Sequence, residues 1–190
     1  MHRPIRRLTL SITSILAALM MSSGNAFAGI DEVRAGGLAQ GVGGWSPDKE
    51  TGVGINLEAL FKSPGFLRAI GAPRPHLGVA IATDNDATSQ IYAGLEWRQH
   101  LARRLFVAGA VGGAVHTGET DTFDPVADLS RLNNTQFLGC RALFRIAADL
   151  GVEVTDHLSV SIAWSHISNA GLCDDNEGLD NLGLRVGYRF

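Results

Sequence analysis

The sequence predicts an all-β fold, namely an eight-stranded antiparallel transmembrane β-barrel of the bacterial outer membrane. Apolar and polar residues alternate with period two in one segment after another, and beyond Ala28 no segment combines helical periodicity with sufficient length. The faces opposite the apolar ones carry many charged residues. The chain ends on Phe190, and apolar or aromatic residues occupy every second position before it. These three observations together favour a closed barrel in lipid.

The first 28 residues have the three-part layout of a secretory signal peptide. Basic residues 1–7 precede a short apolar stretch, and Ala26 and Ala28 give the A-x-A spacing of a cleavage site. The apolar stretch is too short and too lightly flanked to make a good membrane-spanning helix. We therefore expect a signal peptide at 1–28, with an uncleaved anchor as the alternative, and one outer-membrane β-barrel domain at 29–190.

Eight segments follow as strands, each recognised by its alternation. They are residues 30–42, 53–62, 77–82, 91–98, 104–116, 136–154, 158–165 and 182–190. The alternation is clearest in the seventh, where one face carries Leu158, Val160, Ile162 and Trp164 and the other carries Ser159, Ser161, Ala163 and Ser165. The fifth is a Gly/Ala/Val strand, and the eighth places its arginines and glycines opposite an apolar row.

The charged faces indicate which side of the sheet points inward. They carry Glu58, Glu96, Arg98, Arg141, Arg145, Asp149, Arg185 and Arg189. The small core of a soluble sandwich would have to bury these charges, whereas a narrow lumen can pair them. Strands of ~10 residues with apolar side chains outward are typical of transmembrane barrels. With eight strands, the interior is filled by side chains and forms no pore.

The even number of strands also predicts an orientation. Both termini are expected on the periplasmic side, together with the short turns at 100–104 and 154–157. The longer and more polar segments 117–134 and 169–180 are then outer-surface loops. The end of the seventh strand would lie at the outer membrane surface.

Composition bears on partners and on redox state. A formal net charge of −3 gives no reason to expect a nucleic acid partner. Cys140 lies in an apolar run and Cys173 in a polar loop, and two cysteines do not make a disulfide framework. We expect two free thiols, with a bridge formed after export as the alternative. The histidines His76, His100, His116 and His157 are not spaced as the ligands of one metal ion would be. We therefore expect neither a metal nor another cofactor.

The seventh strand ends in His166 and Ser168, which have the same parity as its apolar residues. Both would project from the lipid-facing side, where a neutral imidazole can take the proton of a serine and a carboxylate can orient the ring. The following loop offers Asp174, Asp175, Glu177 and Asp180 as that carboxylate. A nucleophile facing lipid implies a lipid substrate, although histidine and serine are also ordinary residues where a strand leaves the membrane.

The motif around these residues resembles a known family. The run SHISNAG at 165–171, followed by N-E-G-L-D at 176–180 and a final aromatic strand, is similar to the PagL-type lipid A 3-O-deacylases. The preceding FLGCRALFR at 137–145 resembles the same family, so the likeness covers about the last third of the chain. The terminal Phe190 resembles the C-terminal signal of bacterial outer-membrane proteins.

This resemblance implies a serine esterase that removes the ester-linked 3-hydroxyacyl chain at the 3-position of lipid A, without a metal. By position in the motif, His166 corresponds to the general base and Ser168 to the nucleophile. Asn176 and the backbone N–H of Gly171 correspond to the groups that stabilise the oxyanion. The resemblance also implies lipid A or lipopolysaccharide and outer-membrane lipids as partners, with the active site toward the outer leaflet.

The chain departs from the family pattern at the third member of the triad. The family has a glutamate fourteen positions after the histidine, and this chain has Asp180 there. Asp180 is the favoured acid and Glu177 the alternative. Two other functions remain open, an outer-membrane phospholipid esterase and a non-catalytic small structural or adhesion barrel. A homodimer through the lipid-facing wall also remains open.

Overall fold

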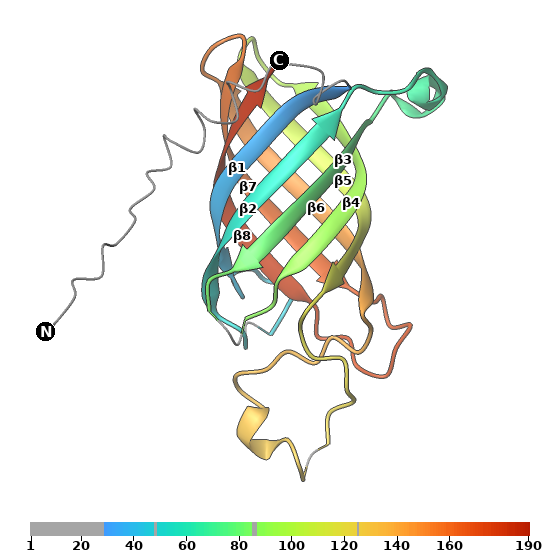
Figure 1. Ribbon diagram of the computed structural model, residues 1–190, viewed down its shortest axis with the longest axis vertical. Coiled ribbons are helices and arrows are strands. Elements are labelled where there is room, and N and C mark those ends of the chain that lie inside the picture. The colour runs from blue at the N-terminus through green and yellow to red at the C-terminus, as the bar shows by residue number, and fades with distance from the viewer. Residues whose placement is uncertain (1–28, 48, 85–86, 125) are drawn as a thin grey trace, which may run out of the picture.

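The computed structural model describes residues 29–47, 49–84, 87–124 and 126–190, so the predicted signal peptide lies outside the described residues. Within them, eight strands form a closed antiparallel barrel in which β8 pairs with β1 (Figure 1). The strands are β1 (Ile30–Gln40), β2 (Gly52–Phe61), β3 (Arg74–Ala82), β4 (Gln90–His100), β5 (Leu105–His116), β6 (Ala142–Glu153), β7 (Leu158–Ser168) and β8 (Leu179–Arg189). Two short 3₁₀ helices, η1 (Gly65–Ile70) and η2 (Leu129–Arg131), lie in the connections. The predicted barrel is confirmed.

The outer wall of the barrel is apolar, as the alternation predicts. Along β2 the side chains of Val53, Ile55 and Leu57 point outward and are exposed, while Asn56 and Glu58 point inward and are buried. Exposed outward and buried inward positions alternate on the other strands as well, because side chains in a strand alternate between the two faces. On β5 the inward side chains are mostly apolar, as with Phe106 and Ala108. Among the described residues, no helix is long and apolar enough to cross a membrane.

The lumen is filled by paired charges. Arg34 contacts the carboxylates of Glu32, Glu58, Glu96 and Asp149. Arg185 pairs with two of the same carboxylates, those of Glu58 and Asp149. Buried charges need partners, since an uncompensated ion in a low-dielectric interior costs several kcal/mol. The predicted inward positions of Glu58, Glu96, Arg98, Arg145, Asp149 and Arg185 are confirmed.

The predicted sixth strand is wrong at its beginning. Residues 136–141 do not continue β6, which begins at Ala142. Phe137 pairs in an isolated bridge with Glu119, and Gly139 adopts a φ of 73°, which turns the chain away from an extended path. Arg141 is consequently exposed, not inside the lumen, and its guanidinium donates to the carbonyl oxygens of His116 and Gly118 at 2.7 and 3.0 Å.

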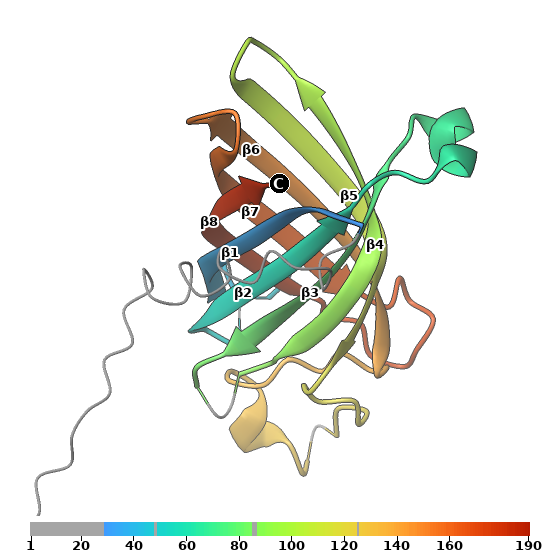
Figure 2. The same cartoon turned by 45° about the horizontal axis from the view of Figure 1, so that its top comes forward.

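The two ends of the barrel differ in their connections. The described residues of segments 41–51, 83–89, 117–141 and 169–178 lie together at one end, which we call the loop end (Figure 1). The C-terminus, the start of β1, the turns 101–104 and 154–157 and the segment with η1 lie at the opposite end (Figure 2). At the loop end, a buried apolar cluster that includes Leu138, Leu143, Ile167 and Leu179 fills the lumen.

Candidate active site

The candidate site lies on the outer face of β7 and β8 at the loop end. The antiparallel register sets His166 directly opposite Asp180. Their side chains meet on the outside of the wall, where Nδ1 of His166 lies 2.8 Å from Oδ1 of Asp180. Ser168 follows His166 by two residues on the same face, a rise of about 6.6 Å along a strand. The residues predicted as base, nucleophile and acid are thus neighbours on one surface.

The contact between His166 and Asp180 determines which ring nitrogen carries the proton. A carboxylate only accepts, so the neutral imidazole donates from Nδ1 and keeps its lone pair at Nε2. Asp180 is fully buried and His166 is 9% exposed, so the pair is shielded from water although it faces outward. This is the tautomer that a general base needs to take a proton through Nε2.

The segment between β1 and β2 covers the carboxylate of Asp180. The backbone N–H groups of Trp45 and Ser46 both donate to its Oδ2 at 3.0 Å, and the hydroxyl of Ser46 lies 3.3 Å from the same oxygen. Gly43 passes so close that a Cβ at this position would overlap the carboxylate. These donors compensate the burial of the charge and fix the carboxylate against His166.

The imidazole is also held by its apolar neighbours. Trp164 stacks on the His166 ring with centroids 6.3 Å apart, and Trp45 meets it edge-on at 5.7 Å. Gly178 lies against the ring, and a Cβ there would come within 2.7 Å of Cε1 of His166. With two aromatic neighbours and a glycine at its edge, the ring has a defined orientation before any substrate binds.

Glu177, the alternative acid, has other partners. Its carboxylate forms an ion pair with Nζ of Lys49 and accepts the backbone N–H of Phe137 at 2.8 Å. Both contacts fasten segment 169–178 to neighbouring loops. The geometry therefore supports Asp180, and not Glu177, as the carboxylate that contacts the histidine.

The residues predicted to stabilise an oxyanion lie in segment 169–178 and are organised by Asn169. The backbone N–H of Gly171 donates to Oδ1 of Asn169 at 2.8 Å, and the N–H of Asn169 donates to Oδ1 of Asn176 at 2.8 Å. The Nδ2 of Asn169 donates to the carbonyl oxygens of Leu138 and Asp175. Because Oδ1 of Asn176 accepts the Asn169 N–H, Nδ2 is the atom with which this side chain can donate, while the Gly171 N–H must leave Asn169 before it can serve an oxyanion.

The two cysteines are paired, so the prediction of free thiols is wrong. Cys140 and Cys173 form a disulfide with their Cα atoms 6.1 Å apart. The pairing follows from the later start of β6 at Ala142, because Cys140 lies in the segment that folds over the loop end and not in a membrane-spanning strand. The bridge joins segments 117–141 and 169–178 beside the candidate site.

Sequence reasoning missed three residues of this site, namely Trp45, Ser46 and Asn169. Trp45 and Ser46 are 135 and 134 positions from Asp180 in the chain, and no local pattern links them to it. Asn169 had a signal, since Asn-x-Gly favours a turn in which the asparagine side chain caps the backbone two residues later. Among the described residues, no group of three or more His, Cys, Asp or Glu side chains is placed to hold a metal ion.

Comparison with known families and structures adds a second line of evidence. Residues 75–189 match the family model of the lipid A 3-O-deacylase (PagL). The crystal structure of the outer membrane enzyme PagL is similar over 84% of this chain and 99% of that chain, with a TM-score of 0.59 and 17% sequence identity. Neisserial surface protein A (NspA) is similar over 85% of this chain and 96% of that chain, with a TM-score of 0.52 and 11% identity. At these identities, both structures support the barrel fold alone.

Two curated relatives with a different name match the chain over only part of their length. A pseudouridine-5'-phosphate glycosidase of Dinoroseobacter shibae is 32% identical over 108 residues, which is 55% of this chain and 34% of that protein. A protein of the same name from Herpetosiphon aurantiacus is 25% identical over 130 residues, 63% of this chain and 43% of that protein. The chain spans less than half the length of either relative, and their glycosidase activity is not assigned to it.

Proposed function

The chain belongs to the lipid A 3-O-deacylase (PagL) family of outer-membrane barrels, and we propose that it hydrolyses the ester-linked 3-hydroxyacyl chain at the 3-position of lipid A. In this proposal Ser168 is the nucleophile, His166 the general base and Asp180 the acid that orients the histidine. The observation that carries it is the 2.8 Å contact between His166 and Asp180 on the outer wall. Ser168 lies on the same face of β7, two residues after His166. The site would face the outer leaflet, where lipid A resides.

The chemistry follows from the positions of these groups. Nε2 of His166 takes the proton of Ser168 as its Oγ attacks the ester carbonyl carbon, and the carbonyl oxygen becomes an oxyanion. Nδ2 of Asn176 and, once released from Asn169, the N–H of Gly171 donate to that oxyanion. Collapse of the intermediate breaks the ester bond, and the lipid A hydroxyl leaves with the proton held by His166. Water then hydrolyses the acyl-serine by the same route and releases a 3-hydroxy fatty acid.

The location of the site explains how a lipid reaches it. The outward residues below His166 on β7 and β8, such as Ile162 and Leu184, are exposed and apolar. An acyl chain can lie against this wall without leaving the membrane, while its ester group reaches the polar boundary at the end of β7. The exposed indole of Trp45 adds an apolar edge beside the imidazole.

The proposal is tested by mass spectrometry of lipid A from cells that express the chain and from cells that carry an empty vector. We expect lipid A from the expressing cells to lose the mass of one hydroxyacyl chain, because ester hydrolysis removes one such group. Heat-modifiable electrophoretic mobility controls for a folded barrel. Accumulation of lysophospholipid with intact lipid A would favour the phospholipid esterase instead, and no change in either lipid would favour a non-catalytic barrel.

Ser46 is expected to act as a positioning residue through Asp180. Ser46→Ala removes the hydroxyl that lies 3.3 Å from Oδ2 and that accepts the backbone N–H of Asp180 at 3.3 Å, but it keeps the two backbone donors to Oδ2. A hydrogen bond to a charged group contributes about 1.5 kcal/mol, so kcat should fall about tenfold with KM nearly unchanged. Steady-state kinetics on purified lipid A measure both constants.

Two further variants separate this role from a general loss of folding. Ser46→Thr retains the hydroxyl and should restore most of kcat. Ser130→Ala, on the exposed η2, makes the same change away from the site and should leave both constants unaltered. A Ser46→Ala variant that changed KM alone would argue against a role through Asp180.

A further inference from the structure

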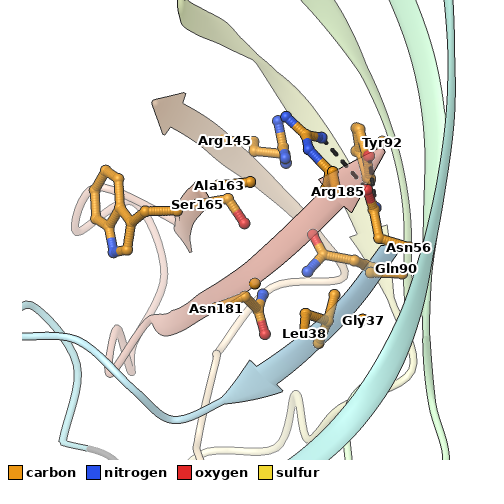
Figure 3. Close-up of a pocket in the computed structure, with 13 residues that line it drawn as sticks. Gly37, Leu38, Asn56, Gln90, Tyr92, Arg145, Ala163, Ser165, Asn181 and Arg185 are labelled. Atoms are coloured by element: carbon orange, nitrogen blue, oxygen red, sulfur yellow. Dashed lines mark hydrogen bonds between the residues drawn. The ribbon is translucent and has the colours of Figure 1, made fainter. Parts of the chain in front are cut away.

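A small polar cavity lies in the lumen, across the barrel wall from His166 and Asp180. Its volume is about 30 Å³, and Gln90, Tyr92, Arg145, Ser165, Asn181 and Arg185 are among the residues that line it (Figure 3). Ser165 and Asn181 are register partners, one position along from the His166–Asp180 pair. We call this cavity the lumen chamber. The buried apolar residues Ile167 and Leu179 lie on its loop-end side, and the carboxylates of the charge network lie on the other.

Arg145 contributes a buried positive charge to the lumen chamber. It is 6% exposed, and its guanidinium lies over the ring of Tyr92 with Cζ 3.9 Å from the centroid. Its Nε has no hydrogen-bond partner, and among the described residues no carboxylate lies within 4.0 Å of its nitrogens. The carboxylates of Glu58 and Asp149 are each paired with Arg185 and Arg34. Stacking on Tyr92 uses the flat face of this guanidinium, whereas its N–H donors point outward at the edge and can still bind an acceptor.

Other donors around the same space also lack partners. The amide Nδ2 of Asn181, which is 3% exposed, and the Nε of Arg185 have no hydrogen-bond partner in the described part of the chain. The hydroxyl oxygen of Tyr92 accepts Nδ2 of Asn56 at 2.8 Å, so its own proton remains available. Against these donors, the unpartnered acceptors among the described residues that line the chamber are the amide oxygens of Gln90 and Asn181. Oδ1 of Asp149, which also has no hydrogen-bond partner, lies in an adjoining space that Arg145 and Arg185 line as well. The chamber is therefore rich in donors and positively charged.

We propose that the lumen chamber binds a small inorganic anion of halide size, which in the native environment is chloride. An unpaired buried guanidinium destabilises the folded state, and a bound anion offsets this cost, whereas a water molecule brings no charge. The volume suits one or two water-sized particles and is too small for a phosphate or sulfate ion. The bound anion would hold Asn181 and Ser165, and so brace β7 and β8 directly behind the candidate site.

The first test uses crystals of the wild-type barrel grown or soaked in bromide, a halide with a strong anomalous signal. The expected result is an anomalous peak in the lumen chamber within hydrogen-bonding distance of Arg145 and Asn181. Water density alone at that position, with no anomalous peak, would overturn the proposal. This test needs no variant and does not depend on deacylase activity.

The second test measures urea unfolding of the refolded barrel at constant ionic strength, with chloride exchanged for the bulkier gluconate. Because the anion binds only the folded state, each tenfold rise in chloride above its dissociation constant should raise the folded-to-unfolded ratio about tenfold. Arg145→Met keeps much of the apolar stem and should abolish this dependence. Arg141→Met, which removes an exposed loop arginine, should retain it.

The remaining outcomes are also decisive. Equal unfolding in chloride and gluconate for the wild type would contradict the proposal, as would an unchanged chloride dependence in Arg145→Met. If Arg145→Met does not fold, the bromide peak and the wild-type chloride dependence decide the question. Deacylase activity can be absent in every one of these samples without affecting the result.

Discussion

Ser168→Ala should abolish hydrolysis of lipid A, with the rate falling by about 10⁶-fold, the size of effect seen when the nucleophile of a serine hydrolase is removed. His166→Ala should lower the rate of hydrolysis by about the same factor. The physical reason is that the two residues act as one unit, since a serine hydroxyl is a weak nucleophile until a base takes its proton. The double variant should therefore be no slower than either single variant. Release of 3-hydroxy fatty acid from purified lipid A measures all three rates.

The matched control is Ser161→Ala on the same strand. Ser161 and Ser168 both belong to β7, but Ser161 is buried in the lumen and Ser168 points outward. This control should keep full activity, which shows that loss of a serine from β7 is not itself harmful. A folded Ser168→Ala barrel with substantial activity would refute the assigned nucleophile. Multiplicative losses in the double variant would instead indicate that His166 and Ser168 act independently.

The barrel could be predicted from the sequence because its determinants are local. Alternation with period two indicates which side chains face outward, as do Val53, Ile55 and Leu57 on β2. The strands form a closed sheet whose polar face is internal, so the inward charges such as Glu58 and Arg185 must pair with one another. The same parity placed His166 and Ser168 on the outer face. Asp180, predicted in the following loop, lies instead at the start of β8, directly opposite His166.

The errors arose where the chain leaves the sheet. Residues 136–141 continue the apolar character of β6, but they fold over the loop end, and period-two alternation does not reveal this turn. The same misplacement put Cys140 inside a strand and hid its disulfide with Cys173. Contacts between distant loops, such as those of Ser46 with Asp180, depend on barrel closure and have no sequence signature. The loop contacts that hold the site in place were therefore less predictable than His166, Ser168 and Asp180 themselves.

Asp180→Asn should reduce kcat by about 10⁴-fold, because an asparagine can present its amide nitrogen to Nδ1 of His166 and favour the wrong tautomer. Glu177→Gln should change kcat only slightly, since Glu177 contacts Lys49 and the Phe137 N–H and not the imidazole. Steady-state kinetics on purified lipid A, with folding checked by electrophoretic mobility, distinguish the two. The opposite ranking would assign the acid to Glu177.

Asp180→Glu completes this comparison, because it restores the glutamate found at this position of the family motif. Its longer side chain has little room, since Gly43 and the N–H groups of Trp45 and Ser46 already surround the Asp180 carboxylate. We expect Asp180→Glu to retain more activity than Asp180→Asn, as it keeps the charge, but less than the wild type. Full activity in Asp180→Glu would mean that the segment between β1 and β2 adapts freely, and the positioning role of Ser46 would then lose its basis. The shorter acid and the close glycine are thus expected to act together, and the two variants at position 180, compared with the wild type, measure that dependence.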